Sequence, residues 1–291
     1  MRIVLPAVVS LSLAALACSG SSGRSGFGED ETAPPADPAK DTTPAPGFDP
    51  APPPPAQPVE IDEVFGHSSD TLYRLDPVTK SVQVVDKFNG CDQIIDIALD
   101  ESSQIYGATY KALYRIDKTN AKCTLVANGE YPNSLSFVPK GTLDANAEAL
   151  VGYDGDTYVR IDTSTGVKTQ VGAIGGGLVS SGDIVSVKGG KTYLTVKGGT
   201  KCNQTDCLVE VDPKTGAMLK NLGSIGYDNV YGLSFWAGKI YGFNDAGDLF
   251  EVTLGSVGIA STLIAIPQKP AGLRFWGAGS TTSAPLEPKP K

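Results

Sequence analysis

Acidic side chains are the residues of this chain whose type and position could support metal or acid–base chemistry. Asp96 and Asp183 each begin a short apolar run, and Asp100 ends the run that Asp96 begins. Oxygen ligands of this kind suit calcium, so these three aspartates are the candidates for a central ion. His67 is the single histidine, which leaves no histidine-based zinc cluster and no second choice of base for a Ser–His–Asp triad. We therefore predict no catalytic residues and no cofactor, with calcium as the alternative.

Aromatic side chains form the second group with a chemical use. Tyr231 and Trp236 bracket a Gly-Leu-Ser-Phe run, and Trp276 ends a similar run that contains Arg274. An aromatic ring has a large flat apolar face, which suits the face of a sugar ring. We name these four residues as the candidate ligand-binding residues. The alternative interpretation is that the rings belong to the core.

The five cysteines indicate an oxidising compartment. Cys202 and Cys207 are close enough in sequence to close a local loop, and Cys91 and Cys123 then remain to pair with each other. Four cysteines allow three connectivities, and this pairing is one of them. Cys18 is the odd cysteine, which in an exported protein is free, intermolecular or chemically used.

Residues 1–17 are predicted to be a secretory signal peptide. They carry one positive charge and an apolar stretch that is too short for a stable membrane span. Their end, Leu13-Ala-Ala-Leu-Ala-Cys18, resembles the lipobox of bacterial lipoproteins, although Ala15 stands where that family usually has Leu. The resemblance implies that Cys18 is acylated, which would account for the odd cysteine and anchor the chain in the membrane. The alternative is cleavage by an ordinary signal peptidase, which would leave a soluble protein with an exposed thiol.

The residue after Cys18 is Ser19 rather than Asp, and by resemblance to Gram-negative lipoproteins this implies an outer-membrane location in the cell envelope. Residues 18–58 follow as the lipidated cysteine and a tether rich in Pro, Ala, Gly and Ser. Such a composition has little to bury and cannot support a helix or a sheet, so a disordered stalk is predicted. We expect a folded domain over residues 59–280 and a flexible tail over 281–291.

Five copies of a short phrase organise the folded domain. They are Leu72-Tyr-Arg-Leu-Asp76, Leu113-Tyr-Arg-Ile-Asp117, Tyr158-Val-Arg-Ile-Asp162, Leu208-Val-Glu-Val-Asp212 and Leu249-Phe-Glu-Val-Thr253. A spacing of 41 to 50 residues is typical of an array of small β-sheets. Alternating apolar runs around each phrase predict four strands per repeat, which is the blade of a β-propeller. The aspartate that ends four of the phrases begins a predicted hairpin turn.

The first repeat lacks room for its innermost strand, because the folded domain has only residues 63–67, enough for one strand, upstream of the phrase that begins at Leu72. At the other end of the chain, Gly272–Gly277 matches the predicted innermost strands and has no repeat of its own. We therefore predict an all-β, five-bladed propeller in which this C-terminal strand completes the N-terminal blade. Such closure removes an exposed sheet edge. Six blades is the alternative.

The repeated phrases resemble those of bacterial exported propellers of the broad NHL and YVTN type, which implies a fold rather than an activity. The net charge of −8 comes without a basic stripe, which argues against nucleic acid as a partner. We predict a membrane-anchored envelope lipoprotein whose propeller binds a protein or a glycan and is not an enzyme. The alternatives are a lactonase- or glycosidase-like propeller hydrolase with a channel-bound divalent ion, and a structural surface lipoprotein.

Overall fold

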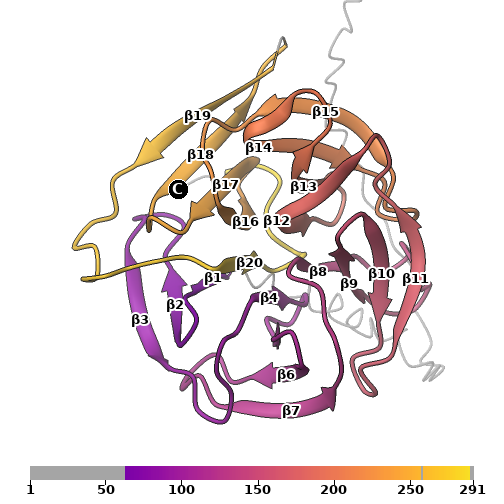
Figure 1. Cartoon of the computed structure of the whole chain (residues 1–291). Helices are drawn as coiled ribbons and strands as arrows, with labels where there is room; N and C mark the ends of the chain where they lie inside the picture. Colours follow the sequence, from indigo (N-terminus) through magenta and orange to yellow (C-terminus); the bar gives the residue numbers. More distant parts are fainter. Residues whose placement is uncertain (1–62, 257, 289–291) are drawn as a thin grey trace, which may run out of the picture. The chain divides into compact units, whose positions relative to one another are not determined.

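The computed structural model of the chain describes residues 63–256 and 258–288. The predicted signal peptide, Cys18 and the tether lie outside these residues. The described residues form twenty strands in five antiparallel sheets of four strands, arranged as blades around a common axis (Figure 1). The fold is therefore a five-bladed β-propeller, and the six-bladed alternative is wrong.

Each blade runs outward from an innermost strand near the axis. Blade 1 contains β20 (Gly277–Ser280), β1 (Val64–His67), β2 (Thr71–Leu75) and β3 (Val82–Lys87). Blade 2 contains β4 (Asp96–Leu99), β5 (Ile105–Ala108), β6 (Ala112–Ile116) and β7 (Cys123–Asn128). Blade 3 contains β8 (Leu135–Val138), β9 (Ala149–Asp154), β10 (Thr157–Ile161) and β11 (Lys168–Ala173). Blade 4 contains β12 (Leu178–Ser186), β13 (Thr192–Gly198), β14 (Cys202–Val211) and β15 (Met218–Ser224). Blade 5 contains β16 (Val230–Trp236), β17 (Lys239–Asn244), β18 (Leu249–Leu254) and β19 (Ile259–Ile264).

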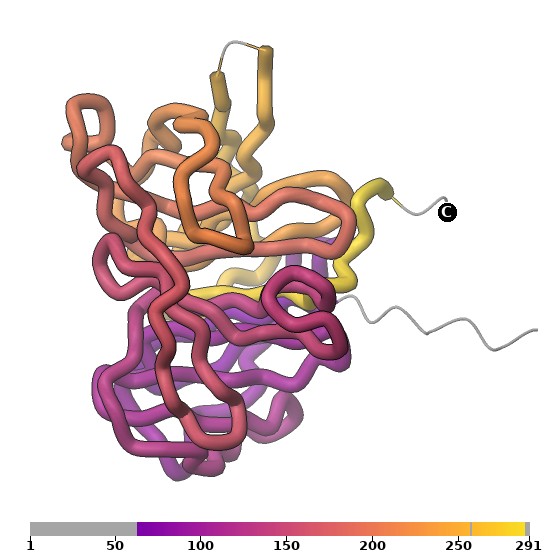
Figure 2. The backbone as a smooth tube through the Cα atoms, turned by 90° about the vertical axis from the view of Figure 1, so that its right-hand side faces the viewer, coloured from indigo at the N-terminus to yellow at the C-terminus, as the bar shows by residue number. Residues whose placement is uncertain are grey.

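The hydrophobic core lies between consecutive blades. Five clusters of buried residues each join two neighbouring blades, including the pair formed by blades 5 and 1. The alternation of side chains along each strand gives every inner strand two buried faces, one for each neighbour. In the side view of Figure 2, the β18–β19 hairpin extends beyond the other blades.

The last strand completes the first blade, as predicted. β20 pairs antiparallel with β1, with Val64 opposite Ser280 and His67 opposite Gly277. The predicted position of this strand is wrong, because residues 272–276 approach the sheet and only Gly277 begins the pairing. Phe275, which the sequence placed inside the strand, instead packs against the rings of Tyr73 and Phe243 in the core between blades 1 and 5.

The predicted tail boundary is also too early. Thr281 and Thr282 are fully buried, and Ala284 belongs to the core between blades 4 and 5. The amide of Lys188 donates to the carbonyl of Thr282 at 2.9 Å, and the Thr282 hydroxyl bonds to Glu148. Residues 281–284 are therefore part of the packed domain rather than a flexible tail.

The predicted turns and disulfides are present. Asp76, for example, accepts hydrogen bonds from the amides of Val78 and Thr79, at 2.8 and 3.0 Å, which closes the hairpin between β2 and β3. Disulfides join the two cysteine pairs that the sequence favoured, Cys91–Cys123 and Cys202–Cys207. The second one closes a bulge of β14, because its two cysteines pair with Gly198 and Val196, which are separated by a single residue.

Candidate ligand-binding site

One end of the propeller axis opens into a pocket of about 490 Å³ to which all five blades contribute. Its lining residues are Ile95, Tyr110, Asn133, Ser181, Tyr231 and Trp276. Five of them stand at or close to the start of an innermost strand, and Tyr110 comes from the turn between β5 and β6. We call this cavity the axial pocket. None of its lining side chains carries a charge, and three of them are aromatic.

Trp276 is held in place by an acid that the sequence analysis did not single out. Its indole Nε1 donates to Asp245 Oδ1 at 3.1 Å, and Arg274 Nε donates to the same oxygen at 2.9 Å. The guanidinium also bonds to Asp245 Oδ2, so the carboxylate joins both residues. Trp276 and Arg274 were predicted ligand-binding residues. Trp276 lines the axial pocket, whereas Arg274 is engaged with Asp245 beside it.

Tyr231 and Tyr110 provide the other two rings. The Tyr231 hydroxyl lies 3.1 Å from Asn229 Oδ1, and burial raises the pKa of Tyr231. Tyr110 is 65% exposed, which is high for a tyrosine ring, so it stands at the rim rather than within the wall. Exposed aromatic rings around a concave, uncharged pocket are typical of small-ligand sites.

Two of the predicted central acids, Asp96 and Asp183, lie beneath the pocket and are completely buried. Each accepts a hydrogen bond from the innermost strand of the next blade: Asp96 Oδ2 accepts from the Leu135 amide at 2.6 Å, and Asp183 Oδ2 accepts from the Leu233 amide at 2.6 Å. Their other oxygens accept from the amides of the residues that follow them. These bonds tie blade 2 to blade 3 and blade 4 to blade 5.

The two carboxyls also interact with each other across the axis. Burial, together with the neighbouring carboxyl of Asp183, raises the pKa of Asp96, and burial raises the pKa of Asp183. A negative charge on Asp183 therefore disfavours ionisation of Asp96. The third predicted acid, Asp100, does not join them. It accepts from the amides of Ser102 and Gln104 in the β4–β5 turn.

His67 completes the buried polar group at the axis. Its Nδ1 donates to the Ser68 carbonyl at 2.8 Å, and its Nε2 is buried without a hydrogen-bond partner. Burial lowers the pKa of His67 to about 4, so the ring is neutral at pH 7. A side chain on Gly277 would collide with both His67 Nε2 and the Asp96 carboxyl, which explains the glycine.

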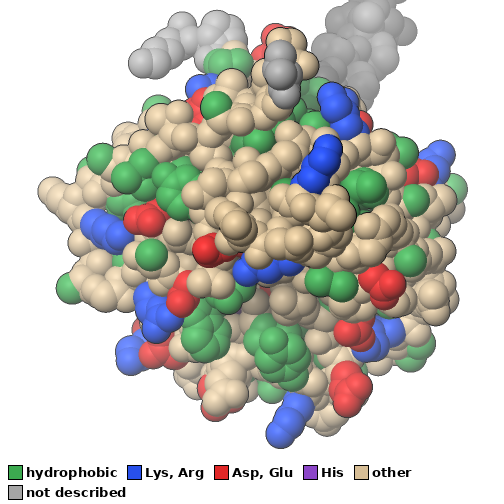
Figure 3. Space-filling model, turned by 45° about the horizontal axis from the view of Figure 1, so that its top comes forward, with side chains coloured by type: hydrophobic (Ala, Val, Ile, Leu, Met, Phe, Trp, Pro, Cys, Tyr) green, Lys and Arg blue, Asp and Glu red, His purple; other side chains and the backbone are tan. Residues whose placement is uncertain are grey.

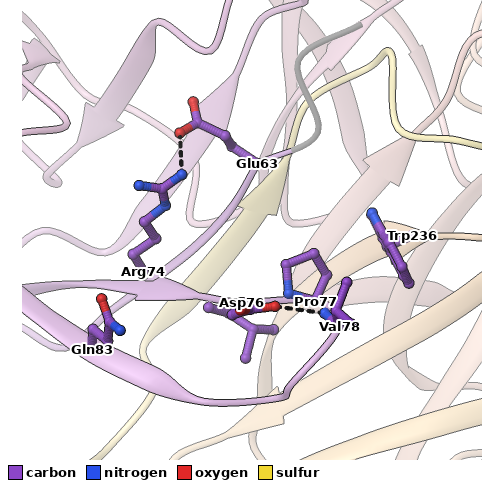
Figure 4. A pocket seen from close by; sticks show the side chains of 8 residues that line it. Glu63, Arg74, Asp76, Pro77, Val78, Gln83 and Trp236 are labelled. Atoms are coloured by element: carbon purple, nitrogen blue, oxygen red, sulfur yellow. Dashed lines mark hydrogen bonds and ion pairs between the residues drawn. The ribbon is translucent and has the colours of Figure 1, made fainter. Parts of the chain in front are cut away.

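Trp236, the remaining predicted ligand-binding residue, does not line the axial pocket. It ends β16, whereas Tyr231 lies near the start of that strand, so the two rings are at opposite ends of the propeller. Trp236 lines a separate cavity of about 440 Å³ with Glu63, Arg74 and the β2–β3 turn (Figure 4). Lys80 Nζ lies 5.4 Å from the centroid of its ring, a cation–π contact that fits a structural role.

The repeated charged residues of the third strands are paired with neighbours near them. Arg74 contacts Glu63 at 3.0 Å and Arg160 contacts Asp144 at 3.1 Å, while Glu210 and Glu251 pair with Lys191 and Lys239, each at 2.7 Å. Acidic and basic side chains are interspersed on the face shown in Figure 3, without a patch of one sign.

Within residues 63–256 and 258–288, no three His, Cys, Asp or Glu side chains are grouped so that they could hold a metal ion together. The calcium alternative therefore remains an untested prediction. No helix formed by these residues is long and apolar enough to cross a membrane.

Comparison with known proteins finds structural similarity at low sequence identity. No family model and no curated protein sequence matches it. A structure from the nidogen/laminin complex is 11% identical, covers 77% of this chain and 99% of its own, and has a TM-score of 0.47. A protein of unknown function from Bacteroides caccae is 12% identical, covers 75% and 98%, and has a TM-score of 0.42. The extracellular domain of a putative one-component system from B. thetaiotaomicron is 13% identical, covers 74% and 28%, and has a TM-score of 0.37. The fold and the cavity together define a five-bladed propeller with an uncharged aromatic pocket at one end of its axis.

Proposed function

We propose that this chain is a non-enzymatic binding module of the bacterial cell envelope and that its axial pocket takes a glycan. The observation that carries the proposal is the composition of the pocket. Five blades bring Tyr110, Tyr231 and Trp276 together with two uncharged polar residues, Asn133 and Ser181. A sugar ring needs an apolar platform for its carbon face and a few polar groups for its hydroxyls, and the pocket offers both.

The state of the axial acids supports binding rather than hydrolysis. A glycosidase needs two carboxyls that reach the substrate, one as an acid and one as a base or nucleophile. Asp96 and Asp183 are the acids nearest the axis, yet both are buried and each accepts two backbone hydrogen bonds. Oxygens used in this way hold the blades together. The hydrolase is therefore the second candidate function, and a peptide ligand is the second candidate for the pocket.

The location is proposed from the N-terminal sequence alone. A signal peptide, acylation at Cys18 and a proline-rich tether would hold the propeller at the outer membrane. Two or more acyl chains provide a stable anchor, whereas one gives only reversible binding. The tether would then present the axial pocket to polymers of the envelope or its surroundings.

An array of uncharged oligosaccharides, followed by calorimetric titration, tests the ligand class. The wild-type chain should bind at least one family of neutral glycans and release no reducing sugar from it. Trp276→Ala should weaken binding tenfold or more, while Trp236→Ala, which changes the other cavity, should leave the affinity unchanged. Absence of glycan binding by the folded wild-type chain would refute the proposal, and release of sugar would favour the hydrolase.

A further inference from the structure

The side chains that line the axial pocket are divided between two arcs of the propeller. The blades follow one another around the axis in chain order (Figure 1). Tyr231 of blade 5, Trp276 before β20 of blade 1 and Tyr110 of blade 2 therefore form one continuous aromatic arc. Asn133 of blade 3 and Ser181 of blade 4 form a polar arc on the other side. A ligand whose ring stacks on the aromatic arc would present its edge to the polar arc.

Asn133 provides the hydrogen-bonding groups of the polar arc that a ligand can reach. It precedes β8, is half-buried and lines the pocket directly. Within residues 63–256 and 258–288 its side chain makes no hydrogen bond, so Oδ1 and both protons of Nδ2 are free for a ligand. The hydroxyl of Ser181, by contrast, is buried behind the pocket surface, close to Asp206. The polar contact with a ligand therefore falls on Asn133.

An apolar wall stands next to this amide. Ile95 lines the pocket just before β4 of blade 2, the neighbour of blade 3. It packs in one core cluster with Tyr131 and Leu135, the residues two positions before and after Asn133. Tyr110 belongs to the same blade as Ile95 and stands at the rim with 65% of its surface exposed. The wall beside Asn133 is therefore apolar from the interior of the pocket to its rim.

The combination of an amide and an apolar wall selects among sugar substituents. An asparagine amide offers an acceptor and a donor side by side, so it can accept from a ligand N–H and donate to the oxygen of a neighbouring hydroxyl. Two adjacent hydroxyls would also fit the amide but would leave the apolar wall without a partner. An acetylated amino group adds a methyl group, whose burial against that wall favours binding. A free amine would bring a charge into a pocket lined by uncharged side chains.

We propose that the axial pocket selects N-acetylated amino sugars and that Asn133 is its specificity-determining residue. Asn133 Oδ1 accepts from the acetamido N–H, and Nδ2 donates to the oxygen of the adjacent hydroxyl. The acetyl methyl group packs against Ile95 and Tyr110. This inference rests on the glycan-binding function proposed above and names the class of glycan.

Calorimetric titration with matched methyl glycosides tests the selection. The N-acetylglucosamine and N-acetylgalactosamine glycosides are compared with those of glucose, galactose and the free amino sugars. The wild-type chain should bind one N-acetylated glycoside roughly tenfold or more tightly than its partner with a hydroxyl at the same carbon. Equal affinity for the two partners would overturn this inference and leave glycan binding intact. Selection of array glycans without acetamido groups would do the same.

Asn133→Ala should remove the preference, while the aromatic arc still binds both partners weakly. The melting temperature should stay the same, because no hydrogen bond within the described residues is lost. Asn146→Ala, an exposed change in the loop between β8 and β9 at the other end of the same blade, is the matched control. An Asn133→Ala chain with the wild-type preference would overturn the role of Asn133. Failure of every glycoside and of the oligosaccharide array to bind would overturn the proposed function as well.

Discussion

Asp245 accepts hydrogen bonds at one oxygen from the Trp276 indole, at 3.1 Å, and from Arg274, at 2.9 Å. Asp245 follows β17 in blade 5, whereas Trp276 leads into β20 of blade 1. The indole ring of Trp276, which forms one wall of the axial pocket, is therefore oriented by Asp245 of the neighbouring blade 5. Asp206 of blade 4 has a similar role: its Oδ2 accepts a hydrogen bond from the amide of Val230, the residue before Tyr231 in blade 5.

Asp245→Ala should loosen Trp276 and weaken ligand binding without unfolding the propeller. The lost hydrogen bonds are partly exposed, so the free energy of unfolding should fall by about 1 kcal/mol or less. Affinity for the array-selected glycan should fall several-fold in calorimetric titration. Asp228→Ala, an exposed change on the loop before β16, is the control and should have no effect. Equal affinities for the two variants would refute the positioning role.

Asp96→Ala and Asp183→Ala should destabilise the fold strongly. Each change leaves two amides unpaired in the buried centre, at about 1–3 kcal/mol each, so a loss of roughly 2–6 kcal/mol is expected. Asp100→Ala, in a turn close to solvent, should cost about 1 kcal/mol or less. Urea denaturation measures all three. Similar losses for Asp96→Ala and Asp100→Ala would contradict the role assigned to the axial pair.

The stability of the domain should depend on pH through Glu148. Burial raises the pKa of Glu148 to about 7 from an ordinary value of 4.5, so the folded state holds a proton that the unfolded state has released. Stability from this group is complete below pH 4.5 and is lost as the pH rises towards 7. The shift sets an upper bound of roughly 3 kcal/mol, which screening by solvent reduces to about 1–2 kcal/mol. Urea unfolding between pH 4.5 and 8 should show a flatter profile for Glu148→Gln; an unchanged profile would rule out this contribution.

Removal of residues 277–291 should open the propeller. β1 would lose its partner β20, and the apolar residues of the core between blades 5 and 1 would become exposed. We expect a loss of several kcal/mol, or roughly 10 °C or more in melting temperature, together with aggregation on size exclusion. Deletion of residues 289–291 alone is the control. A truncated monomer with the melting temperature of the full chain would show that closure contributes little.

Acylation at Cys18 predicts a clear biochemical outcome in a bacterial host. The full chain should incorporate labelled palmitate and sediment with membranes, and Cys18→Ser should do neither. Incorporation is read by autoradiography of the purified chain. Equal recovery of both forms in the soluble fraction would favour the ordinary signal peptidase.

Much of the fold was predictable because the blades are built locally. Each repeated phrase forms the third strand of a blade, and in four of the five phrases the final aspartate closes the next hairpin, as at Asp76. Closure by the C-terminus was also predictable, but its register was not. Gly272–Trp276 resembles Gly232–Trp236, yet Phe275 fills the core between two blades, and small residues from Gly277 onward form the strand beside the axis.

The site was predictable only in part. Tyr231 and Trp276 could be singled out because they stand at the ends of predicted inner strands. Trp236 was grouped with them, but five steps along an extended strand separate its side chain from that of Tyr231 by roughly 17 Å, so the two rings line different cavities. Asp245 and Asp206 stand outside the repeated phrases, so the sequence did not single them out. Their hydrogen-bond partners come from other blades, and only the assembled propeller brings them together.

The indole N–H signal of Trp276 provides the most direct test of the axial pocket as the binding site. In a ¹⁵N-labelled Trp236→Phe chain this is the single indole signal, and in a Trp276→Phe chain the single signal is that of Trp236. Titration with the array-selected neutral glycan should shift the Trp276 signal in a saturable way and leave the Trp236 signal in place. A shift of the Trp236 signal with none at Trp276 would contradict the assignment of the site.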